Sequence, residues 1–401
     1  MRLLFLALEP PFPPNDGGRI RTYNILRQVA RRHEVTLATF ADGEQDQERL
    51  AALGQVCHQV VALSRPSVPA RTLPRKVAGF FRRTPVCLQQ YRSPALEAAL
   101  RRWAAEGAFD IVHVDQILLA QYARALRPLP AVLTHHNIEA EVQRRQIALD
   151  RRMSPSRRLL ARIECRRWRY YELSASRRFG ALACVSARDA AYFRRHLPGV
   201  PAVVVPNGVD TQAFRPVNRD GAEPVLLYSG RMDYPPNVDA MRWFCDEILP
   251  QVQQAVPAVR LLIVGRDPTA EVRALAGRPG IQVTGTVPDV RPYYAQAALY
   301  IVPLRFGAGT RLKILEAMAM GMAIVSTPLG SEGLELRPGQ DLMEAGSAPA
   351  FARAIVELLN NGERRARLGA QARRTAEARF DWAQIALAQE EAYRLAMDRS
   401  G

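Results

Sequence analysis

The sequence contains almost no lysine. Only Lys76 and Lys313 are lysines, whereas the other 53 of its 55 basic residues are arginines. With 401 residues, the chain is long enough that this scarcity is not an effect of small size. Because the chain uses arginine for nearly every basic position, a lysine within a candidate binding motif indicates a specific requirement for lysine there. Lys313 lies in such a motif.

Cysteines and long apolar segments are also scarce. The five cysteines are odd in number and form no CxxC pair, so the sequence indicates neither a disulfide framework nor a zinc site. The apolar stretch after Arg2 stops at Glu9, which makes it too short for a signal-peptide core or a membrane span. With 48% hydrophobic residues, the chain is expected to be a globular cytoplasmic protein and not a disordered or fibrous one.

Acidic residues are too few to balance the charge of the first half. Residues 1–200 hold 33 basic and 17 acidic side chains, whereas residues 201–401 hold 22 of each. The formal net charge of +16 therefore belongs entirely to the first half. The length suggests two domains of similar size, one basic and one neutral, because compact domains usually have about 100 to 200 residues.

Short β-rich apolar segments alternate with helical patterns, which predicts parallel sheets built from βα units. The expected strands are 3–8, 35–40, 57–63, 110–114, 131–135, 181–186 and 202–206 in the first half, and 225–230, 260–265, 281–285, 299–303 and 323–327 in the second. We expect an α/β protein with two doubly wound, Rossmann-like domains facing a central cleft. The predicted division is a first domain at 1–206, a linker at 207–222, a second domain at 223–379, and a final helix at 380–401 that can cross back to the first domain.

The most specific motif is RFGAGTRLKILEAMAMG at residues 305–321. It places a Gly-rich loop between a strand and a helix, and backbone N–H groups at a helix start favour an anion such as phosphate. Lys313 and Glu316 share a helix face, so the ammonium can meet a diphosphate and the carboxylate can meet ribose hydroxyls. An isolated pair of this kind is more often an ordinary surface ion pair. The rarity of lysine favours the binding interpretation.

Two further segments of the second half lie at predicted strand ends. YSGRMDYPPN contains Gly230, which allows a tight turn, and Arg231, whose guanidinium fork can grip phosphate oxygens. Gly265 closes the next strand, and the later loop that contains Val287 can lie against a nucleobase. Plain βα turns would carry the same glycines, so a purely structural role is an equal alternative for this second segment.

In the first half, Gly17 and Gly18 lie in a predicted loop between the first strand and its helix, where the backbone can approach a phosphate or a sugar. His135 and His136 end a later strand. No third ligand with metal spacing follows them, so we expect no metal site and interpret the pair as a source of polar substrate contacts.

Together, these residues resemble a retaining glycosyltransferase of family 4, of the polysaccharide-biosynthesis type, with the GT-B fold. The motifs that carry the resemblance are PPNDGG, THHN, PNGVD, SGR, IVG, GTVPDVRPYY and, most specifically, GTRLKILEAMAMGMAIVST. The family implies a nucleotide-sugar donor bound mainly to the second domain and an acceptor glycan held by the first. No cofactor and no metal ion are expected, because the nucleotide-sugar is itself a substrate.

The resemblance also implies roles for particular residues. Arg231 and Lys313 would hold the donor diphosphate and stabilise the charge that grows on the leaving group. Glu316 would bind the ribose, and His136 would lie beside the donor sugar. Further donor contacts are implied for Gly230, Gly265, Val287, Gly309, Thr310, Arg311 and Leu312, and the loop of Gly17 and Gly18 would contact the acceptor or a phosphate.

The sequence departs from the family pattern at two places. Many members carry a Glu eight positions before the helix Glu, where this chain has Ala308, so a carboxylate for the donor sugar hydroxyls is missing. The usual Lys after the SGR segment is missing too, which leaves Lys313 and Arg311 to supply the phosphate charge. Ala308 keeps open the alternative of a GT-B-fold binding protein without transferase activity.

The basic half contains two segments in which arginines and apolar residues are interleaved. Residues 151–178 hold ten arginines against two glutamates, and residues 71–83 hold a second cluster with Phe80 and Phe81. Such segments are typical of membrane-surface elements, so we expect an anionic membrane and a lipid-linked acceptor as partners, at the inner face of the cytoplasmic membrane. A solvated arginine-rich face is one alternative. Nucleic-acid binding is another, but it leaves the donor motif unexplained, and no nucleic acid is expected as a partner.

Overall fold

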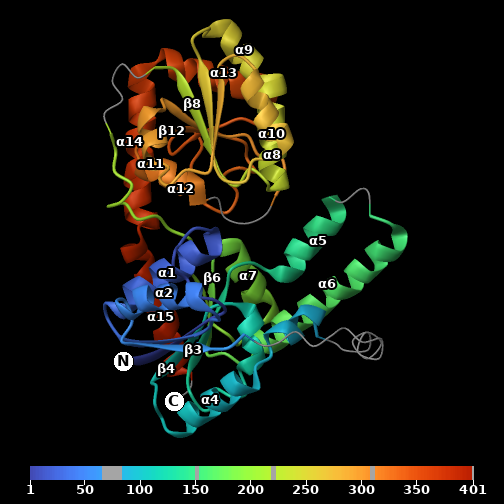
Figure 1. The fold of residues 1–401 in the computed structure, drawn as a ribbon, viewed down its shortest axis with the longest axis vertical. Coiled ribbons are helices and arrows are strands. Elements are labelled where there is room, and N and C mark those ends of the chain that lie inside the picture. Colours follow the sequence, from blue (N-terminus) through green and yellow to red (C-terminus); the bar gives the residue numbers. More distant parts are fainter. Residues whose placement is uncertain (66–83, 150–152, 218–222, 308–311, 400–401) are drawn as a thin grey trace. The chain divides into compact units, whose positions relative to one another are not determined.

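The structure is a computed structural model that describes residues 1–65, 84–149, 153–217, 223–307 and 312–399. The chain divides into two compact units, which can be followed by colour in Figure 1. Unit 1 comprises Met1–Pro206 and Ile385–Gly401, and unit 2 comprises Asn207–Gln384. The chain therefore leaves unit 1 once and returns to it at the C-terminal end.

Unit 1 is built on a parallel sheet whose described strands follow the order β3-β2-β1-β4-β5-β6-β7. They are β1 (Arg2–Ala7), β2 (Glu34–Phe40), β3 (Gln59–Leu63), β4 (Ile111–Val114), β5 (Ala131–His135), β6 (Ala181–Cys184) and β7 (Ala202–Val204). Because β1 pairs with both β2 and β4, the strand order reverses at β1. The carboxyl ends of β1 and β4 open onto this switch point, where doubly wound sheets bind ligands.

Helices pack around the sheet of unit 1. They are α1 (Gly17–Ala30), α2 (Glu44–Gly54), α4 (Pro94–Ala105), α5 (Glu139–Leu149), α6 (Pro155–Ser176) and α7 (Ala187–His196), with short helical turns η1 (Val86–Tyr91) and η2 (Ile117–Tyr122). Asp16, Ser154 and Ser186 each accept a backbone N–H and so fix where α1, α6 and α7 begin. Helices α5 and α6 form a hairpin that projects from the sheet of this unit (Figure 1).

Unit 2 has a second parallel sheet, with described strands in the order β10-β9-β8-β11-β12-β13. They are β8 (Val225–Ser229), β9 (Arg260–Val264), β10 (Ile281–Gly285), β11 (Leu299–Val302), β12 (Ala323–Ser326) and β13 (Met343–Glu344). The order reverses at β8, which pairs with β9 and β11. The surrounding helices are α8 (Pro235–Trp243), η3 (Phe244–Ile248), α9 (Leu249–Ala255), α10 (Ala270–Ala274), η4 (Leu275–Gly277), α11 (Arg291–Gln296), α12 (Leu312–Ala319), α13 (Ala348–Asn360), α14 (Gly362–Thr375), η5 (Ala376–Phe380) and the start of α15 (Trp382–Asp398).

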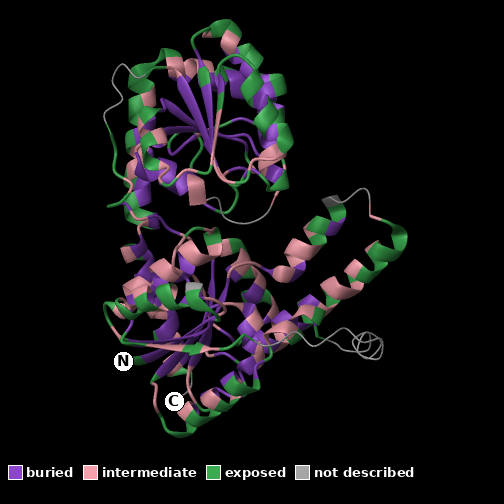
Figure 2. Ribbon diagram, viewed as in Figure 1, coloured by how far each residue is buried: buried purple, intermediate pink, exposed green. Residues whose placement is uncertain are grey.

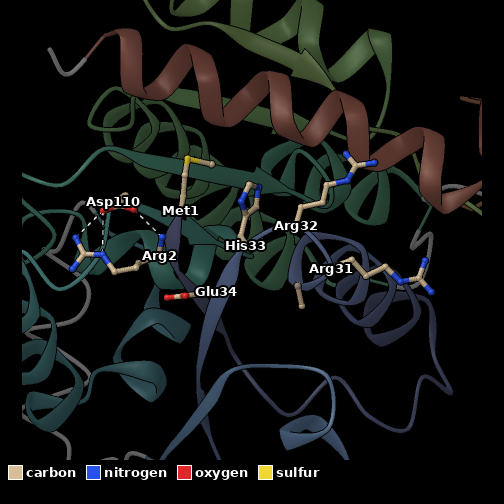
Figure 3. A pocket seen from close by; sticks show the side chains of 8 residues that line it. Met1, Arg2, Arg31, Arg32, His33, Glu34 and Asp110 are labelled. Carbon is tan, nitrogen blue, oxygen red and sulfur yellow. Dashed lines mark hydrogen bonds and ion pairs between the residues drawn. The ribbon is translucent and has the colours of Figure 1, made fainter.

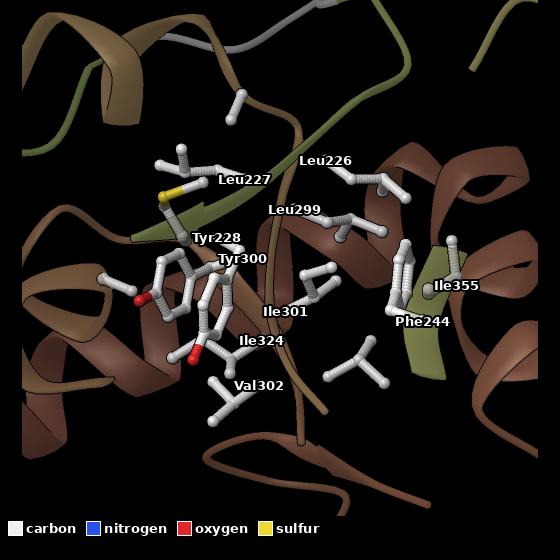
Figure 4. Packing of buried hydrophobic residues seen from close by; sticks show 14 of the residues in the cluster. Leu226, Leu227, Tyr228, Phe244, Leu299, Tyr300, Ile301, Val302, Ile324 and Ile355 are labelled. Atoms are coloured by element: carbon white, nitrogen blue, oxygen red, sulfur yellow. The ribbon is translucent and has the colours of Figure 1, made fainter. Parts of the chain in front are cut away.

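The core of unit 2 lies between its sheet and its helices. Figure 4 shows Leu226, Tyr300 and Ile324 of neighbouring strands together with Phe244 and Ile355 of the helices. A parallel sheet that is covered on both faces needs nearly continuous apolar strands, and the central strands of both sheets are buried in this way (Figure 2). This is the physical reason why apolar segments located the strands in the sequence.

The predicted α/β class with two Rossmann-like units is confirmed. Every segment predicted as a strand overlaps one to within a residue or two at each end, and the structure adds the short β13. One local prediction is wrong, because Gly17 and Gly18 lie in the first turn of α1 and not in a loop before it. The Asp16 side chain accepts the N–H of Arg19 at 3.1 Å and so caps the helix at that point.

Candidate active site

The turn after β8 in unit 2 is formed by two backbone segments in close contact. The N–H of Gly230 donates to Val264 O at 3.0 Å, and a Cβ added at Gly265 would lie only 1.7 Å from Gly230 O. Glycine is therefore required at Gly265. Asn237 Nδ2 donates to Arg231 O at 2.8 Å and supports the turn from α8. These contacts form a fixed platform at the carboxyl ends of β8 and β9.

The Arg231 side chain extends from this platform. It is 53% exposed, and its Nε lies 3.0 Å from Asp233 Oδ1. The hydrogen bond from Arg231 lowers the pKa of Asp233 below its usual value. An ion pair this exposed is weak, so a diphosphate, which carries two negative charges, can compete with Asp233 for the guanidinium.

The motif of helix α12 is joined to the same platform by a tyrosine. Lys313 Nζ lies 3.1 Å from Glu316 Oε2, and Tyr294 of α11 donates to that same oxygen at 3.0 Å. Tyr294 Oη also lies 2.9 Å from the hydroxyl of Ser229, the last residue of β8. The structure therefore brings Lys313 and Glu316 to the segment that carries Gly230–Arg231.

The surroundings of Glu316 differ from those of a surface ion pair. The Lys313 side chain is 37% exposed, whereas that of Glu316 is only 11% exposed. Tyr294 and Tyr300 stack beneath it with ring centroids 5.5 Å apart. Burial raises the pKa of Tyr294 well above its usual value, so its hydroxyl stays a hydrogen-bond donor at neutral pH. This arrangement can hold an anion at Lys313 and a hydroxyl group at Glu316.

The remaining predicted donor contacts are described only in part. Val287, in the loop after β10, and Leu312, the first residue of α12, are half-buried and pack against the core of unit 2. Gly309, Thr310 and Arg311, together with Ala308, lie outside the described residues.

In unit 1, Asp115 lies at the centre of a polar network. It follows β4 directly and is 2% exposed. Its Oδ1 lies 3.1 Å from His136 Nε2, and its Oδ2 accepts a hydrogen bond from Thr22 Oγ1 at 2.6 Å. Thr22 is one turn along α1 from Gly18. The start of α1 and the ends of β4 and β5 therefore converge on one carboxylate.

The charge of Asp115 is maintained by its neighbours. Burial works to raise the pKa of Asp115, but His136 and His113 outweigh burial and hold the pKa well below its usual value. The carboxylate is therefore ionised at neutral pH and can orient the His136 ring through Nε2. The His136 side chain is 17% exposed, so part of the ring remains accessible to a ligand.

The adjacent His135 has a different environment. It is fully buried, its Nε2 lies 3.0 Å from Ser176 Oγ, and its ring lies 4.2 Å from that of Phe193. Burial lowers the pKa of His135 to about 3, so this imidazole is neutral. Successive residues of an extended chain point to opposite sides, which explains why one histidine packs in the core and the next reaches Asp115.

A small pocket lies at the carboxyl ends of β1 and β4. Its lining includes Glu9, Gly18, Arg19, Thr22 and Asp115. Arg19 Nη2 lies 2.6 Å from Glu9 Oε2, so the cation is already paired. With two carboxylates, one paired cation and a hydroxyl group, the pocket is suited to the hydroxyl groups of a sugar.

A second pocket lies at the amino-terminal edge of the same sheet (Figure 3). Arg2 Nη2 lies 2.8 Å from Asp110 Oδ1, and His33 Nε2 lies 2.8 Å from Glu390 Oε2. Doubly wound sheets bind their ligands at the opposite, carboxyl edge. We interpret these pairs as contacts that stabilise unit 1.

Metal-binding clusters and membrane spans were sought among the described residues. In that part of the chain, no three or more His, Cys, Asp or Glu side chains are grouped so that they could hold a metal ion. No described helix combines the length and the apolar character that crossing a bilayer requires. The five cysteines carry free thiols.

Sequence reasoning missed Asp115 and Tyr294. Asp115 directly follows a predicted strand, so the rule that ligands bind at strand ends could have identified it. Tyr294 lies in the PYY segment, where a tyrosine is as typical of a core as of a site. Only its contact with Glu316 distinguishes it.

In comparison with known proteins, each half of the chain matches a family of glycosyltransferases. The family described as Glycosyltransferase Family 4 matches residues 15–213, and the family described as Glycosyl transferases group 1 matches residues 223–361. The chain is a family 4 glycosyltransferase. The phosphatidyl-myo-inositol mannosyltransferase of Mycobacterium leprae is 28% identical to it over 363 residues, which are 84% of this chain and 88% of the relative. A GDP-mannose-dependent monoacylated alpha-(1-6)-phosphatidylinositol monomannoside mannosyltransferase of Corynebacterium glutamicum is 25% identical over 202 residues, 44% of this chain and 52% of that protein.

This family 4 glycosyltransferase also shares its fold with solved structures. Sucrose-phosphate synthase from Thermosynechococcus elongatus matches it with a TM-score of 0.68 at 19% identity, over 98% of each chain. At this identity the likeness shows the fold alone, and that fold is the GT-B fold predicted from the motifs. The protein is thus a nucleotide-sugar-dependent glycosyltransferase with two Rossmann-like units.

Proposed function

We propose that this glycosyltransferase transfers a mannosyl residue from GDP-mannose, with retention, to a lipid-linked or polysaccharide-precursor glycan at the cytoplasmic face of the membrane. The observation that carries the proposal is the link from Lys313 and Glu316 through Tyr294 to the turn at Gly230–Arg231. The mannosyl donor is supported by the relatives, both of which are named as mannosyltransferases and one as GDP-mannose-dependent.

The donor diphosphate is held by Arg231 and Lys313 in this proposal. Each cation pairs with a carboxylate in the structure, Arg231 with Asp233 and Lys313 with Glu316. Phosphate oxygens replace these partners when the donor binds, since charge-assisted hydrogen bonds to phosphate are strong. Glu316 then accepts hydrogen bonds from the ribose hydroxyls and keeps its contact with Tyr294.

Catalysis follows from the position of the two cations. When the bond between the sugar and the diphosphate breaks, negative charge grows on the departing phosphate oxygen, and fixed cations stabilise it more in the transition state than in the ground state. Retention requires the acceptor oxygen to attack from the face that the diphosphate leaves, and the acceptor proton passes to the departing phosphate. Arg231 and Lys313 supply the charge for this step, so we propose that it needs no metal ion.

The sugar side of the reaction is assigned to unit 1. His136 contacts the donor sugar, and Asp115 holds its ring in position. Ala308 stands where many family members carry a carboxylate, so the proposal assigns the contact to the sugar hydroxyls to backbone groups of the Gly-rich motif and not to a side chain at this position. The pocket lined by Glu9, Gly18 and Thr22 receives the acceptor hydroxyl groups.

Helix α6 is the proposed contact with the membrane. Leu159 is 60% exposed and Leu160 is 55% exposed, although both are apolar. Exposed arginines follow them along the helix at Arg162, Arg166 and Arg169. Leucines can enter the interface of a bilayer while arginines bind lipid phosphates, and each basic residue near an anionic surface contributes about 1 kcal/mol before screening. The second predicted basic segment, residues 71–83, lies outside the described residues.

Thermal unfolding with different nucleotide-sugars tests the donor assignment. A ligand that binds only the folded state, at a concentration 100 times its Kd, raises the free energy of unfolding by about 2.7 kcal/mol. If GDP-mannose is the donor, it binds most tightly and should raise Tm more than UDP-glucose or ADP-glucose at the same concentration. The shift should persist in Arg367→Ala, which removes a cation paired with Glu363 on the exposed surface of α14, and should vanish in Lys313→Ala. A larger shift with UDP-glucose would overturn the donor, and no shift with any nucleotide-sugar would overturn the site.

A further inference from the structure

The C-terminal helix reaches the polar network around Asp115. Tyr393 of α15 is fully buried, and its hydroxyl lies 2.6 Å from Nδ1 of His113 in β4. On the other side of the ring, His113 Nε2 lies 3.0 Å from Thr134 Oγ1 and 3.7 Å from Asp115 Oδ1. The His113 ring also stacks on Phe5 at 4.2 Å, so its plane is fixed.

These contacts determine which ring nitrogen of His113 carries the proton. Burial lowers the pKa of His113, so the imidazole is neutral and has only one N–H. The charged carboxylate of Asp115 repels a nitrogen lone pair and attracts an N–H, which places the proton on Nε2. The bare Nδ1 then needs a donor, and the Tyr393 hydroxyl supplies it.

We propose that Tyr393 is a positioning residue for His136, acting through His113 and Asp115. Its hydroxyl fixes the tautomer in which His113 turns an N–H toward Asp115. That N–H donates to Thr134 Oγ1 at 3.0 Å and lies 3.7 Å from the carboxylate, which it attracts electrostatically. The carboxylate also accepts the hydroxyl of Thr22 and holds His136 Nε2 at 3.1 Å. The role of His136 in this chain of contacts rests on the proposed function.

Tyr393 thus gives helix α15 a role beyond packing. Helix α15 contacts the rest of unit 1 at a second point, where Glu390 Oε2 lies 2.8 Å from His33 Nε2. Of the two contacts, the one through Tyr393 is linked to His136, because His113 and His136 share Asp115 as a neighbour. Tyr393 of α15 thereby holds the side chain of His136, at the end of β5, in position.

The experiment compares the full chain with Tyr393→Phe, which keeps the aromatic ring and removes only the hydroxyl. The matched control is Tyr171→Phe, which removes another buried hydroxyl of unit 1, one that donates to Ile117 O at 3.2 Å. The His113 tautomer is read from long-range 1H–15N correlations of histidine-labelled protein, assigned with a His113→Gln variant. Mannosyl transfer from GDP-mannose is measured in parallel.

We expect the Nε2–H tautomer in the wild type and in Tyr171→Phe, and a loss of that single tautomer in Tyr393→Phe. The kcat of Tyr393→Phe should fall about threefold to tenfold, as the loss of one hydrogen bond implies, while the KM for the donor stays unchanged. An Nδ1–H tautomer in the wild type, an unchanged tautomer in Tyr393→Phe, or an unchanged kcat would each overturn the proposal. The tautomer measurement needs no substrate, so its result is independent of whether the chain transfers mannose.

Discussion

The hydroxyl of Tyr294 lies 3.0 Å from Glu316 Oε2 and 2.9 Å from Ser229 Oγ. One buried group therefore connects helix α12 to the end of β8, two segments that the sequence separates by more than 80 residues. This connection links the two elements that carry Lys313 and Arg231, the cations of the proposed donor site. It also makes the site sensitive to a residue that touches neither phosphate nor sugar.

Tyr294→Phe should weaken nucleotide binding and destabilise unit 2. The change removes one hydrogen bond from Glu316 and one from Ser229, which keep Lys313 and Tyr300 as partners, and the loss of two such bonds costs about 1 to 3 kcal/mol. We expect a lower Tm and a Kd for GDP, measured by calorimetry, that rises about tenfold or more. Tyr293→Phe, at the neighbouring half-buried position, is the control and should bind GDP as the wild type does. Equal GDP affinity in both variants would contradict a role for Tyr294.

Glu172 predicts a pH dependence of stability. Its buried carboxylate accepts the backbone N–H groups of Glu139 at 2.6 Å and Ala140 at 3.1 Å, where α5 begins after His136. Burial raises the pKa of Glu172 from its ordinary value of 4.5 to about 8. Between these values the folded state retains a proton that the unfolded state has lost, so the folded state becomes less stable as pH rises.

The free energy of unfolding should therefore decrease between pH 4.5 and about 8, by at most about 1.4 kcal/mol per pH unit from this group. Above the folded pKa the contribution should become constant. Glu172→Gln cannot ionise and should lose this component of the slope. Urea denaturation of both proteins across this pH range provides the measurement, and parallel curves would show that Glu172 does not retain its proton.

Removal of divalent metal ions should leave transfer unchanged. The proposed site balances the diphosphate with Arg231 and Lys313, whose exposed side chains can reach phosphate oxygens. Rates measured with GDP-mannose in excess EDTA and in excess Mg²⁺ should agree within about twofold, which corresponds to less than 0.5 kcal/mol. A large loss of activity in EDTA that Mg²⁺ or Mn²⁺ restores would show that the two cations are not sufficient.

Membrane binding should depend on the exposed apolar residues of α6. Leu159→Gln combined with Leu160→Gln keeps every arginine and removes the side chains that enter the bilayer. We expect this variant to sediment less with phosphatidylglycerol vesicles at low salt, whereas Leu387→Gln, at another leucine that is 52% exposed, should sediment as the wild type does. Added salt should release the wild type, because part of its binding is electrostatic.

Two outcomes would contradict this account of α6. One is equal binding to uncharged phosphatidylcholine vesicles and to phosphatidylglycerol vesicles. The other is displacement of the protein from vesicles by a short DNA duplex at equal affinity, which would favour a nucleic-acid partner.

Local patterns in the sequence predicted the fold and proposed candidate residues for the site. Lys313 and Glu316 became candidates because a spacing of three residues fixes one helix face, and Arg231 because it follows an apolar strand and a glycine. Asp115 and Tyr294 act on residues that lie 21 and 22 positions away. Such contacts depend on how strands and helices pack, which no short-range pattern encodes. The start of α1 at Gly17 was likewise determined by one side chain, the capping carboxylate of Asp16.

The proposed role of Lys313 at the donor diphosphate can be measured by mannosyl transfer. Transfer of radiolabelled mannose from GDP-mannose to membrane lipid extracts should be compared among the wild type, Lys313→Ala and Arg367→Ala. Loss of a fixed cation at the leaving group should lower kcat by about a hundredfold to a thousandfold, while circular dichroism shows an intact fold and Arg367→Ala transfers normally. Near-normal turnover by folded Lys313→Ala would contradict the assignment of the donor site to this motif.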